Sequence, residues 1–480
     1  GVVPEYPRQE LPDATKWDHT KWSPNYRNDN RIETHESGTA PCKTACPAHV
    51  AVQGYLKLAA QGRYDEALAL IKRENPLPAI CGRVCNRRCE DACTRGRVDA
   101  AVAIDEVKKF IAQRDLDAAT RYVPPVVTPT RAGGFDQKIA IIGAGPAGLS
   151  CAFYLAEKGY KPVVFEKNER PGGMLTYGIP SFKLQKDVIE AEVEVIRLMG
   201  AEFRYGVEVG RDVTLDELRE QGFKAFYVAI GCQGGRLAGI PGEDAEDVTV
   251  AVDFLREVNS GKVDALPGRT IVVGGGNVAI DVARNACRLG SEHVEMFCLE
   301  SEAQMPASEE ERREAVDDGA HISCGWGPKE VHLDEAGRVC GITFKRCTRV
   351  FDDEGRFAPE YDENDLRRVD ADRVVMSIGQ SIVWGDLLAG SKVELGRGQG
   401  ALADPQTYQT AEPDIFVGGD VYTGPSFAID AIAAGHEAAV SIHRFVQPGS
   451  TLTIGRNQRH YTALDRDDVV IESYDNASRE

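Results

Sequence analysis

Strand-length apolar runs that alternate with helix-length stretches are the dominant pattern of this chain, and the clearest example begins at Lys138. An apolar run, Lys138 to Ile142, is followed by a glycine-rich turn and an alanine-rich helical pattern from Pro146 to Lys158. A second apolar strand, Pro162 to Phe165, ends on Glu166. This order predicts a βαβ unit of an α/β fold.

The turn of this unit has the spacing of a dinucleotide-binding loop. Gly143 would permit the tight turn, Gly145 would let backbone N–H groups reach a pyrophosphate, and Gly148 would let the helix press on the strand. Glu166 follows Gly143 by 23 residues and can accept hydrogen bonds from ribose hydroxyls. A glycine-rich loop of some other α/β fold is the alternative, but the complete order of elements favours a dinucleotide. The predicted contacts here are Gly143, Gly145, Pro146, Ala147, Gly148, Glu166 and Lys167.

The same order of strand, glycine turn, helix and strand recurs between Pro267 and Glu300, with strand TIVVGGG, helix NVAIDVARNACRLG and strand VEMFCLE. Two such units in one chain predict two bound dinucleotides. The acidic strand end, Glu300, would repel a 2′-phosphate and hydrogen-bond ribose hydroxyls, so NADH is the expected substrate. The predicted contacts of this unit are Gly274, Gly276, Asn277, Val278, Ala279 and Glu300.

Cysteines are concentrated before the first βαβ unit, where six of the thirteen lie between Cys42 and Cys93. Two short amphipathic helices, Val50 to Ala60 and Tyr64 to Arg73, are predicted between the first cysteines and the rest. Thiols repeated every fourth residue point to a soft-metal centre rather than to core packing. Tetrahedral zinc would take four of them, and so would an iron–sulfur cubane. An electron carrier suits a chain that is expected to bind redox dinucleotides, which favours the cluster. The candidate ligands are Cys42, Cys46, Cys81, Cys85, Cys89 and Cys93.

Length and charge narrow the remaining classes. A chain of 480 residues is expected to form roughly two to four domains. The net charge of −19 argues against nucleic acid or an anionic membrane as partner. No stretch approaches the roughly 20 apolar residues of a membrane span, and the polar N-terminus lacks the apolar core of a secretory signal. A cytoplasmic protein is therefore expected.

The segment NPLPAICGRVCNRRCEDAC with the following GRVDAAVAIDEVKKF resembles the N-terminal iron–sulfur domain of the glutamate synthase small-subunit family. That family is similar to the N-terminal part of dihydropyrimidine dehydrogenase and to the large subunit of NADH-dependent ferredoxin:NADP oxidoreductase. The resemblance extends from about Cys42 to about Phe445. It implies FAD in the first βαβ unit, a nicotinamide dinucleotide in the second, and a helical iron–sulfur domain before both.

The resemblance also bears on the cluster ligands. Many relatives hold two cubanes, with an extra cysteine pair where this chain reads ETHESGTAP, and they place a non-cysteine ligand where it has Lys108. This implies one cubane, held by Cys46, Cys81, Cys85 and Cys89. A second centre would have to use Cys42 and Cys93 with His35 or a carboxylate.

Further cofactor contacts follow from the same resemblance. In this class an aspartate at the position of Asp420 binds the ribityl chain, and the next helix directs its N-terminus at the isoalloxazine. A plain N-cap or turn role for Asp420 is the alternative. Relatives that use NADPH carry paired arginines where this chain has Leu299 and Glu300, which again implies NADH. The additional implied contacts are Gly172, Gly173, Met174, Gly231, Gly379, Gly419, Asp420, Ser426 and Ala428.

The expected domain order is an arm with a helical cluster domain (1–130), an FAD-binding domain (131–240 and 385–447), an inserted NAD-binding domain (241–384) and a C-terminal tail (448–480). The chain is thus predicted to be an α/β protein with two Rossmann-like dinucleotide-binding domains behind a helical iron–sulfur domain.

The expected function is an oxidoreductase subunit that passes electrons between NADH, FAD and a [4Fe–4S] cluster, to or from a partner redox subunit. The small subunit of a glutamate synthase is an alternative. A flavin disulfide reductase would need a cysteine pair facing the flavin, and the cysteines near candidate positions are expected to be single: Cys151, Cys232, Cys287 and Cys324. A zinc-bearing assembly module and a flavin oxidase of an organic substrate also stay open. Hydride transfer needs no acid–base group, so no catalytic side chain is predicted.

Overall fold

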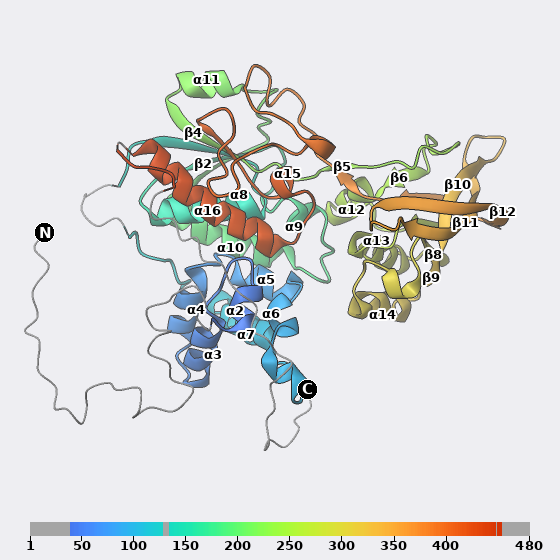
Figure 1. The fold of residues 1–480 in the computed structure, drawn as a ribbon, viewed down its shortest axis with the longest axis horizontal. Helices are drawn as coiled ribbons and strands as arrows, with labels where there is room; N and C mark the ends of the chain where they lie inside the picture. Colours follow the sequence, from blue (N-terminus) through green and yellow to red (C-terminus); the bar gives the residue numbers. More distant parts are fainter. Residues whose placement is uncertain (1–38, 128–133, 448, 454–480) are drawn as a thin grey trace, which may run out of the picture.

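The computed structural model describes residues 39–127, 134–447 and 449–453, which form two α/β units and a helical domain (Figure 1). The predicted arm before residue 39, with His35, and most of the predicted tail lie outside the described residues. None of the helices in the described ranges is long and apolar enough to cross a membrane. The predicted fold class is confirmed.

The first unit is built on a five-stranded parallel sheet with the order β15-β4-β1-β2-β3. Strands β1, β2, β4 and β15 are almost entirely buried because helices cover the sheet, which explains their apolar runs, whereas the edge strand β3 is partly exposed. Helices α8 and α16 pack together across one face (Figure 1). The bounds are β1 Lys138–Ile142, α8 Pro146–Glu157, β2 Val163–Glu166, α9 Met174–Tyr177, α10 Lys186–Leu198, β3 Glu202–Tyr205, α11 Leu215–Glu220, β4 Phe223–Val228, β15 Ile415–Val417, α15 Asp420–Thr423 and α16 Ala428–Val446.

The second unit repeats this plan with the parallel order β6-β13-β7-β8-β9. A three-stranded antiparallel sheet, β10-β11-β12, packs beside it, and the sequence analysis did not predict this sheet. The chain passes between the two units twice, and β5 pairs with β14 where it does so. The bounds are β5 Gly234–Gly235, β6 Val248–Val250, α12 Ala251–Asn259, β7 Arg269–Val273, α13 Asn277–Arg288, β8 His293–Cys298, η4 Glu302–Gln304, α14 Glu309–Asp317, β9 His321–Cys324, β10 Trp326–Leu333, β11 Val339–Phe351, β12 Phe357–Val369, β13 Arg373–Met376, β14 Gln380–Ser381 and η5 Arg397–Gln399.

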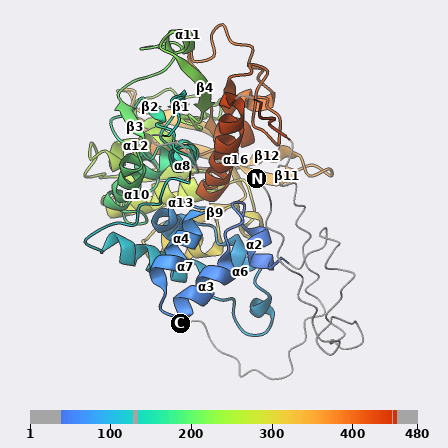
Figure 2. The same ribbon diagram turned by 90° about the vertical axis from the view of Figure 1, so that its left-hand side faces the viewer.

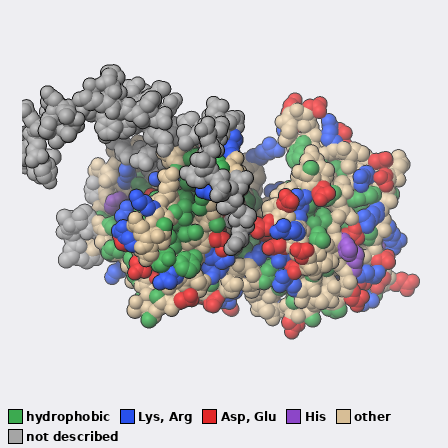
Figure 3. All heavy atoms as spheres, turned by 90° about the horizontal axis from the view of Figure 1, so that it is seen from below, with side chains coloured by type: hydrophobic (Ala, Val, Ile, Leu, Met, Phe, Trp, Pro, Cys, Tyr) green, Lys and Arg blue, Asp and Glu red, His purple; other side chains and the backbone are tan. Residues whose placement is uncertain are grey.

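The helical domain carries all six clustered cysteines and lies beneath the first unit in Figures 1 and 2. Tyr154 of α8 donates a hydrogen bond to the carbonyl of Lys72 at 3.2 Å, which ties the domain to the first sheet's helix layer. Figure 3 views this side, where hydrophobic side chains gather over the helical domain and charges of both signs mix over the second α/β unit. The bounds are α2 Pro41–Ala45, α3 Val52–Ala60, α4 Tyr64–Lys72, α5 Pro78–Val84, α6 Arg88–Asp91, η3 Thr94–Arg97 and α7 Ile104–Leu116.

Candidate functional site

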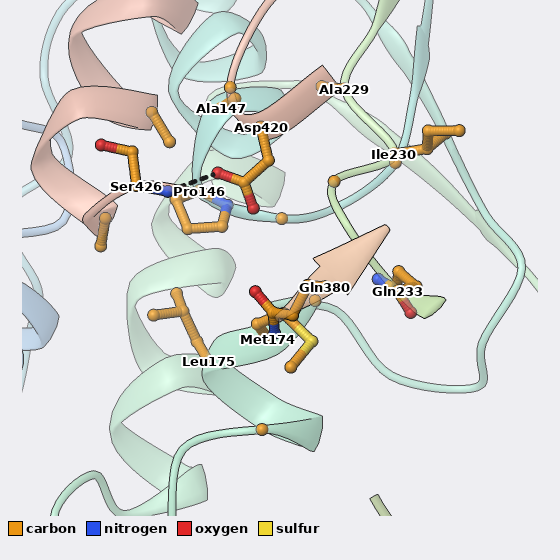
Figure 4. A pocket seen from close by; sticks show the side chains of 18 of the residues that line it. Pro146, Ala147, Met174, Leu175, Ala229, Ile230, Gln233, Gln380, Asp420 and Ser426 are labelled. Atoms are coloured by element: carbon orange, nitrogen blue, oxygen red, sulfur yellow. Dashed lines mark hydrogen bonds between the residues drawn. The ribbon is translucent and has the colours of Figure 1, made fainter. Parts of the chain in front are cut away.

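A cavity opens at the carboxyl ends of β1 and β4 and continues between the two α/β units (Figure 4). Its walls come from the first glycine turn, from α9, from the loops after β4 and β15, and from the beginning of α16. The second unit contributes Val278 and Asp281 of α13, and Gln380 of the returning chain. The predicted residues that line it are Gly143, Gly145, Pro146, Ala147, Glu166, Gly173, Met174, Gly231, Val278, Gly419, Asp420, Ser426 and Ala428.

The first glycine turn is tightly packed at Gly143 and Gly148 and open at Gly145. Gly143 has φ +105°, and a Cβ there would lie 2.4 Å from the Ala229 carbonyl oxygen. A Cβ on Gly148 would lie 1.9 Å from the Gly143 carbonyl oxygen, so only glycine lets α8 approach the turn this closely. A Cβ on Gly145 would meet nothing within 4 Å and would point into open space. The turn is therefore a cradle that a side chain at Gly145 would fill.

Glu166 is buried at the end of β2, with 4 % of its surface exposed. Its carboxylate accepts hydrogen bonds from the Ala144 amide at 2.9 Å and from the amide and side chain of Asn168 at 2.9 and 2.7 Å. It lines both the main cavity and a smaller one beside it, where Lys167 also lies. The carboxylate is thus held where the two cavities meet.

Asp420 begins α15 after Gly419, and burial raises the pKa of its carboxyl to about 6. Its carboxylate accepts a hydrogen bond from the Ser426 amide at 3.2 Å (Figure 4). The carboxylate also comes within reach of Gly231, whose Cβ would lie 3.9 Å from it. A buried acidic group at the cavity wall suits a hydroxyl-rich ligand that donates hydrogen bonds to it.

Helix α16 is fixed with its first turn at the cavity because it packs directly on α8. A Cβ on Gly435 would lie 2.2 Å from the Ala147 carbonyl oxygen, and the Ser150 hydroxyl donates to the Ile432 carbonyl at 2.7 Å. The N-terminal end of this 19-residue helix therefore faces the cavity, where its dipole stabilises negative charge.

The second glycine turn has the same arrangement as the first. Gly274 has φ +143°, and a Cβ there would lie 2.2 Å from the Ser377 carbonyl oxygen, whereas a Cβ on Gly276 would meet nothing within 4 Å. Glu300 follows β8, and its Oε2 atom is 3.0 Å from the position that a Cβ of Gly275 would occupy. The carboxylate thus lies against the turn.

The remaining predicted residues lie outside the main cavity. Gly148 packs α8 on its turn and Gly172 has φ +107° beside Thr176, while Gly379 directly precedes the lining residue Gln380. Gly274, Gly276, Asn277, Ala279 and Glu300 belong to the second turn and its strand end. Sequence reasoning missed Gln233, Leu255, Asp281 and Gln380; Asp281 follows Asn277 by one helical turn, a spacing that could have indicated it.

The cysteines form two neighbouring groups. Cys85 interacts electrostatically with Cys81, Cys89 and Cys46, and Cys42 interacts with both Cys93 and Cys46. Burial raises the pKa of Cys81, of Cys85 and of Cys89, the last to about 12.

Among the described residues, no three Cys, His, Asp or Glu side chains converge on a point that one metal ion could occupy.

One expectation about the other cysteines is wrong. Cys324 is not single, because its sulfur lies 3.7 Å from that of Cys298 on the neighbouring strand. This pair lies at the ends of β8 and β9, and no cysteine lines the main cavity.

Two known families match separate parts of the chain. Residues 137–435 match the family described as pyridine nucleotide-disulphide oxidoreductase. Residues 33–120 match the family described as dihydropyrimidine dehydrogenase domain II, 4Fe–4S cluster. The cofactors of these families are FAD with a nicotinamide dinucleotide, and a 4Fe–4S cluster.

Curated relatives cover most of the chain. The beta subunit of the NADP(+)-dependent formate dehydrogenase of Moorella thermoacetica is 36 % identical over 86 % of this chain, which spans 61 % of that subunit. The glutamate synthase [NADPH] small chain of Escherichia coli K12 is 35 % identical over 85 % of this chain and 89 % of its own length. The PreT subunit of the NAD-dependent dihydropyrimidine dehydrogenase of Escherichia coli O157:H7 is 32 % identical over 85 % and 91 %.

Solved structures share the fold. FprA of Mycobacterium tuberculosis in complex with NADPH matches with a TM-score of 0.55 at 20 % identity, over 64 % of this chain and 84 % of that one. Together, the match over residues 137–435 and the coverage of the small chain show that this protein belongs to the pyridine nucleotide-disulphide oxidoreductase family, among the glutamate synthase small-chain relatives with an N-terminal 4Fe–4S domain.

Proposed function

We propose that this chain is the NADH-oxidising flavoprotein subunit of a larger redox complex. The observation that carries the proposal is the single cavity whose walls come from both dinucleotide-binding units. Val278 and Asp281 of the second unit face the same space as Asp420 and the first turn of α16. Two ligands bound to the two units would therefore meet there.

FAD suits the first unit because the open space at Gly145 accommodates a pyrophosphate and Glu166 lies where a ribose is expected. When bound, FAD accepts a hydride from a nicotinamide and releases single electrons. Asp420 would accept hydrogen bonds from the ribityl hydroxyls, and the N-terminus of α16 would favour negative charge on the ring. These residues would bind and orient the cofactor.

NADH is the proposed substrate because Glu300 lies against the second glycine turn. A carboxylate there can accept hydrogen bonds from the two ribose hydroxyls and would repel a 2′-phosphate. The curated relatives named above include both NADP- and NAD-dependent enzymes, so their names do not decide between the two nucleotides. The proposed preference for NADH is therefore based on the Glu300 side chain.

The 4Fe–4S cluster is proposed to bind Cys46, Cys81, Cys85 and Cys89, because Cys85 interacts electrostatically with Cys81 and Cys89, and Cys46 interacts with Cys85 and Cys89. The segment between the last two ligands also contacts the flavin unit. Arg88 donates to both carboxylate oxygens of Asp430, at 2.9 and 3.2 Å, in the first turn of α16. This ion pair holds the cluster segment near the cavity.

A partner redox subunit is the proposed destination or source of the electrons. Several relatives are named as one subunit of a larger enzyme, including the formate dehydrogenase beta subunit and the glutamate synthase small chain. A glutamate synthase large subunit is one such partner. Disulfide reduction is disfavoured because no cysteine lines the described cavity.

The test is anaerobic reduction of the full chain by NADH, in the wild type and in Cys85→Ser. The wild type should show flavin bleaching and the spectrum of a reduced cluster. Cys85→Ser should lose cluster absorbance and iron while its flavin is still bleached by NADH. Retention of four irons per chain by Cys85→Ser would reject the ligand set, and a wild type that NADH does not bleach would reject the function. Isolation of the native complex would identify the partner.

A further inference from the structure

Helix α7, which follows the cysteine segment, places a buried lysine beside that segment. Lys108 of α7 is 7 % exposed and forms an ion pair with Asp105, one turn earlier on the same helix. Asp105 is itself 3 % exposed. Such a buried ammonium needs an environment rich in negative charge.

The first turns of α7 are fixed between the two helices that carry the cysteines. A Cβ on Gly82, next to Cys81, would lie 2.8 Å from the Lys109 Cα atom, so α5 and α7 are in direct backbone contact. The Asp105 amide donates to the Glu90 carboxylate, next to Cys89, at 2.8 Å. These contacts define the position of Lys108 relative to both sides of the proposed ligand set.

Lys108 lies near enough to Cys81, Cys85 and Cys89 to interact electrostatically with all three. The ion pair with Asp105 keeps the Lys108 ammonium charged although it is buried.

We propose that Lys108 is not a cluster ligand but a fixed charge that raises the reduction potential of the proposed 4Fe–4S cluster. The proposal rests on the ligand set given above. It adds a residue that is not a ligand but changes the reduction potential of the cluster. Reduction adds one negative charge to a group that already carries thiolate charge, and a nearby buried cation stabilises that extra charge. Without the cation, reduction becomes harder.

The experiment is a potentiometric titration of the full-length protein, with the reduced cluster followed by its paramagnetic resonance signal. Lys108→Met keeps the length of the side chain and removes its charge. At a given solution potential, its ratio of reduced to oxidised cluster should fall on the order of tenfold, which is 59 mV for a one-electron couple. Lys109→Met is the matched control, because Lys109 is adjacent, 42 % exposed and paired with Glu106; its potential should equal that of the wild type.

Asp105→Asn provides a second variant in case the uncompensated Asp105 of Lys108→Met prevents cluster assembly. It removes the opposing carboxylate and should shift the potential the other way, to more positive values. A Lys108→Met cluster with the wild-type potential would overturn the proposal, as would an Asp105→Asn shift that is absent or negative. Iron and sulfide content measured on the same samples tests the ligand set separately, so the two failures are distinguishable.

Discussion

At the scale of single residues, the site is made by glycines and by one acidic side chain at the end of each βαβ unit. Gly145 and Gly276 occupy equivalent places, and neither would clash with protein atoms if it carried a Cβ. Gly143 and Gly274 are different, because they have φ of +105° and +143° and lie against carbonyl oxygens. Gly145 and Gly276 therefore leave open space for ligands. At Gly143 and Gly274 the backbone conformation and the close carbonyl oxygens allow only glycine.

Substitution of the open glycines should therefore separate the two dinucleotides. Gly145→Val should fold and lose FAD, because the branched side chain takes the place of the pyrophosphate. Gly276→Val should stay yellow and lose reduction by NADH. Flavin content after purification and bleaching by NADH measure both effects. A fully yellow Gly145→Val would contradict the FAD assignment.

Replacement of Leu299 and Glu300 together by arginine tests the nucleotide preference. In the wild type, a 2′-phosphate beside the Glu300 carboxylate should cost on the order of 2–4 kcal/mol through repulsion and lost hydrogen bonds. This corresponds to roughly 30- to 1,000-fold preference for NADH. The two arginines should reduce or reverse this preference for NADH, since guanidinium groups pair well with phosphate.

The measurement is the rate of flavin reduction by NADH and by NADPH in both proteins. Equal rates in the wild type, or faster reduction by NADPH, would mean that Glu300 does not face the ribose.

At the scale of elements, the position of α13 relative to the flavin unit depends on a buried charge cluster. Lys183, in the loop before α10, contacts Asp281 of α13 at 2.5 Å and Glu311 of α14. The three side chains are 15, 13 and 24 % exposed. Burial raises the pKa of Asp281 to about 6, although Lys183 lowers it. One lysine thus links the two dinucleotide-binding units.

Lys183→Met should destabilise the protein by about 3 kcal/mol at pH 8, because it leaves two carboxylates without their cation. The substitution should also raise the pKa of Asp281 further, since Lys183 lowers this pKa in the wild type. A carboxyl whose folded-state pKa is raised favours folding at low pH and loses this contribution as pH rises through that pKa. The loss should therefore be smaller at pH 5 than at pH 8.

Urea unfolding at both pH values measures this difference. Arg204→Met is the control, because its pair with Glu202 is 41 and 56 % exposed and should contribute little. A loss in Lys183→Met that is equal at both pH values would contradict the role assigned to Asp281.

At the scale of the whole molecule, consecutive residues of the cysteine segment contact both α/β units. Arg87 donates to Glu310 of α14 at 2.6 Å, and Arg88 pairs with Asp430 of α16 and lies over the Phe427 ring at 5.4 Å. Phe427 lines the cavity. The helical domain is thus attached beside the cavity that residues of both α/β units line.

Arg88→Met should weaken this attachment by about 1 kcal/mol, since the pair is bidentate but partly exposed. Hydrogen exchange of residues 85–93 and 426–431 should then become about fivefold faster. Arg63→Met, which removes an exposed pair with Glu66, should leave exchange in both segments unchanged. Unchanged exchange in Arg88→Met would show that other contacts hold the domain.

The sequence by itself determined the local elements of this protein. The predicted strand Lys138 to Ile142 matches β1, and the predicted helices at 50–60 and 64–73 match α3 and α4 within two residues. This succeeded because glycine turns, apolar periodicity and cysteine spacing are properties of neighbouring residues. The fold class followed from them, and the identity of the cofactors followed from the family resemblance that these segments carry.

Only the tertiary structure decided which distant residues meet. Asp281 and Gln380 line the flavin-side cavity, and Cys298 lies beside Cys324 because β8 and β9 are neighbours. Arg88 and Asp430 are 342 positions apart in the chain. Such contacts depend on how completed elements pack, and local spacing carries no information about that packing. The antiparallel strands β10–β12 were missed for a related reason: their half-exposed faces give no continuous apolar run.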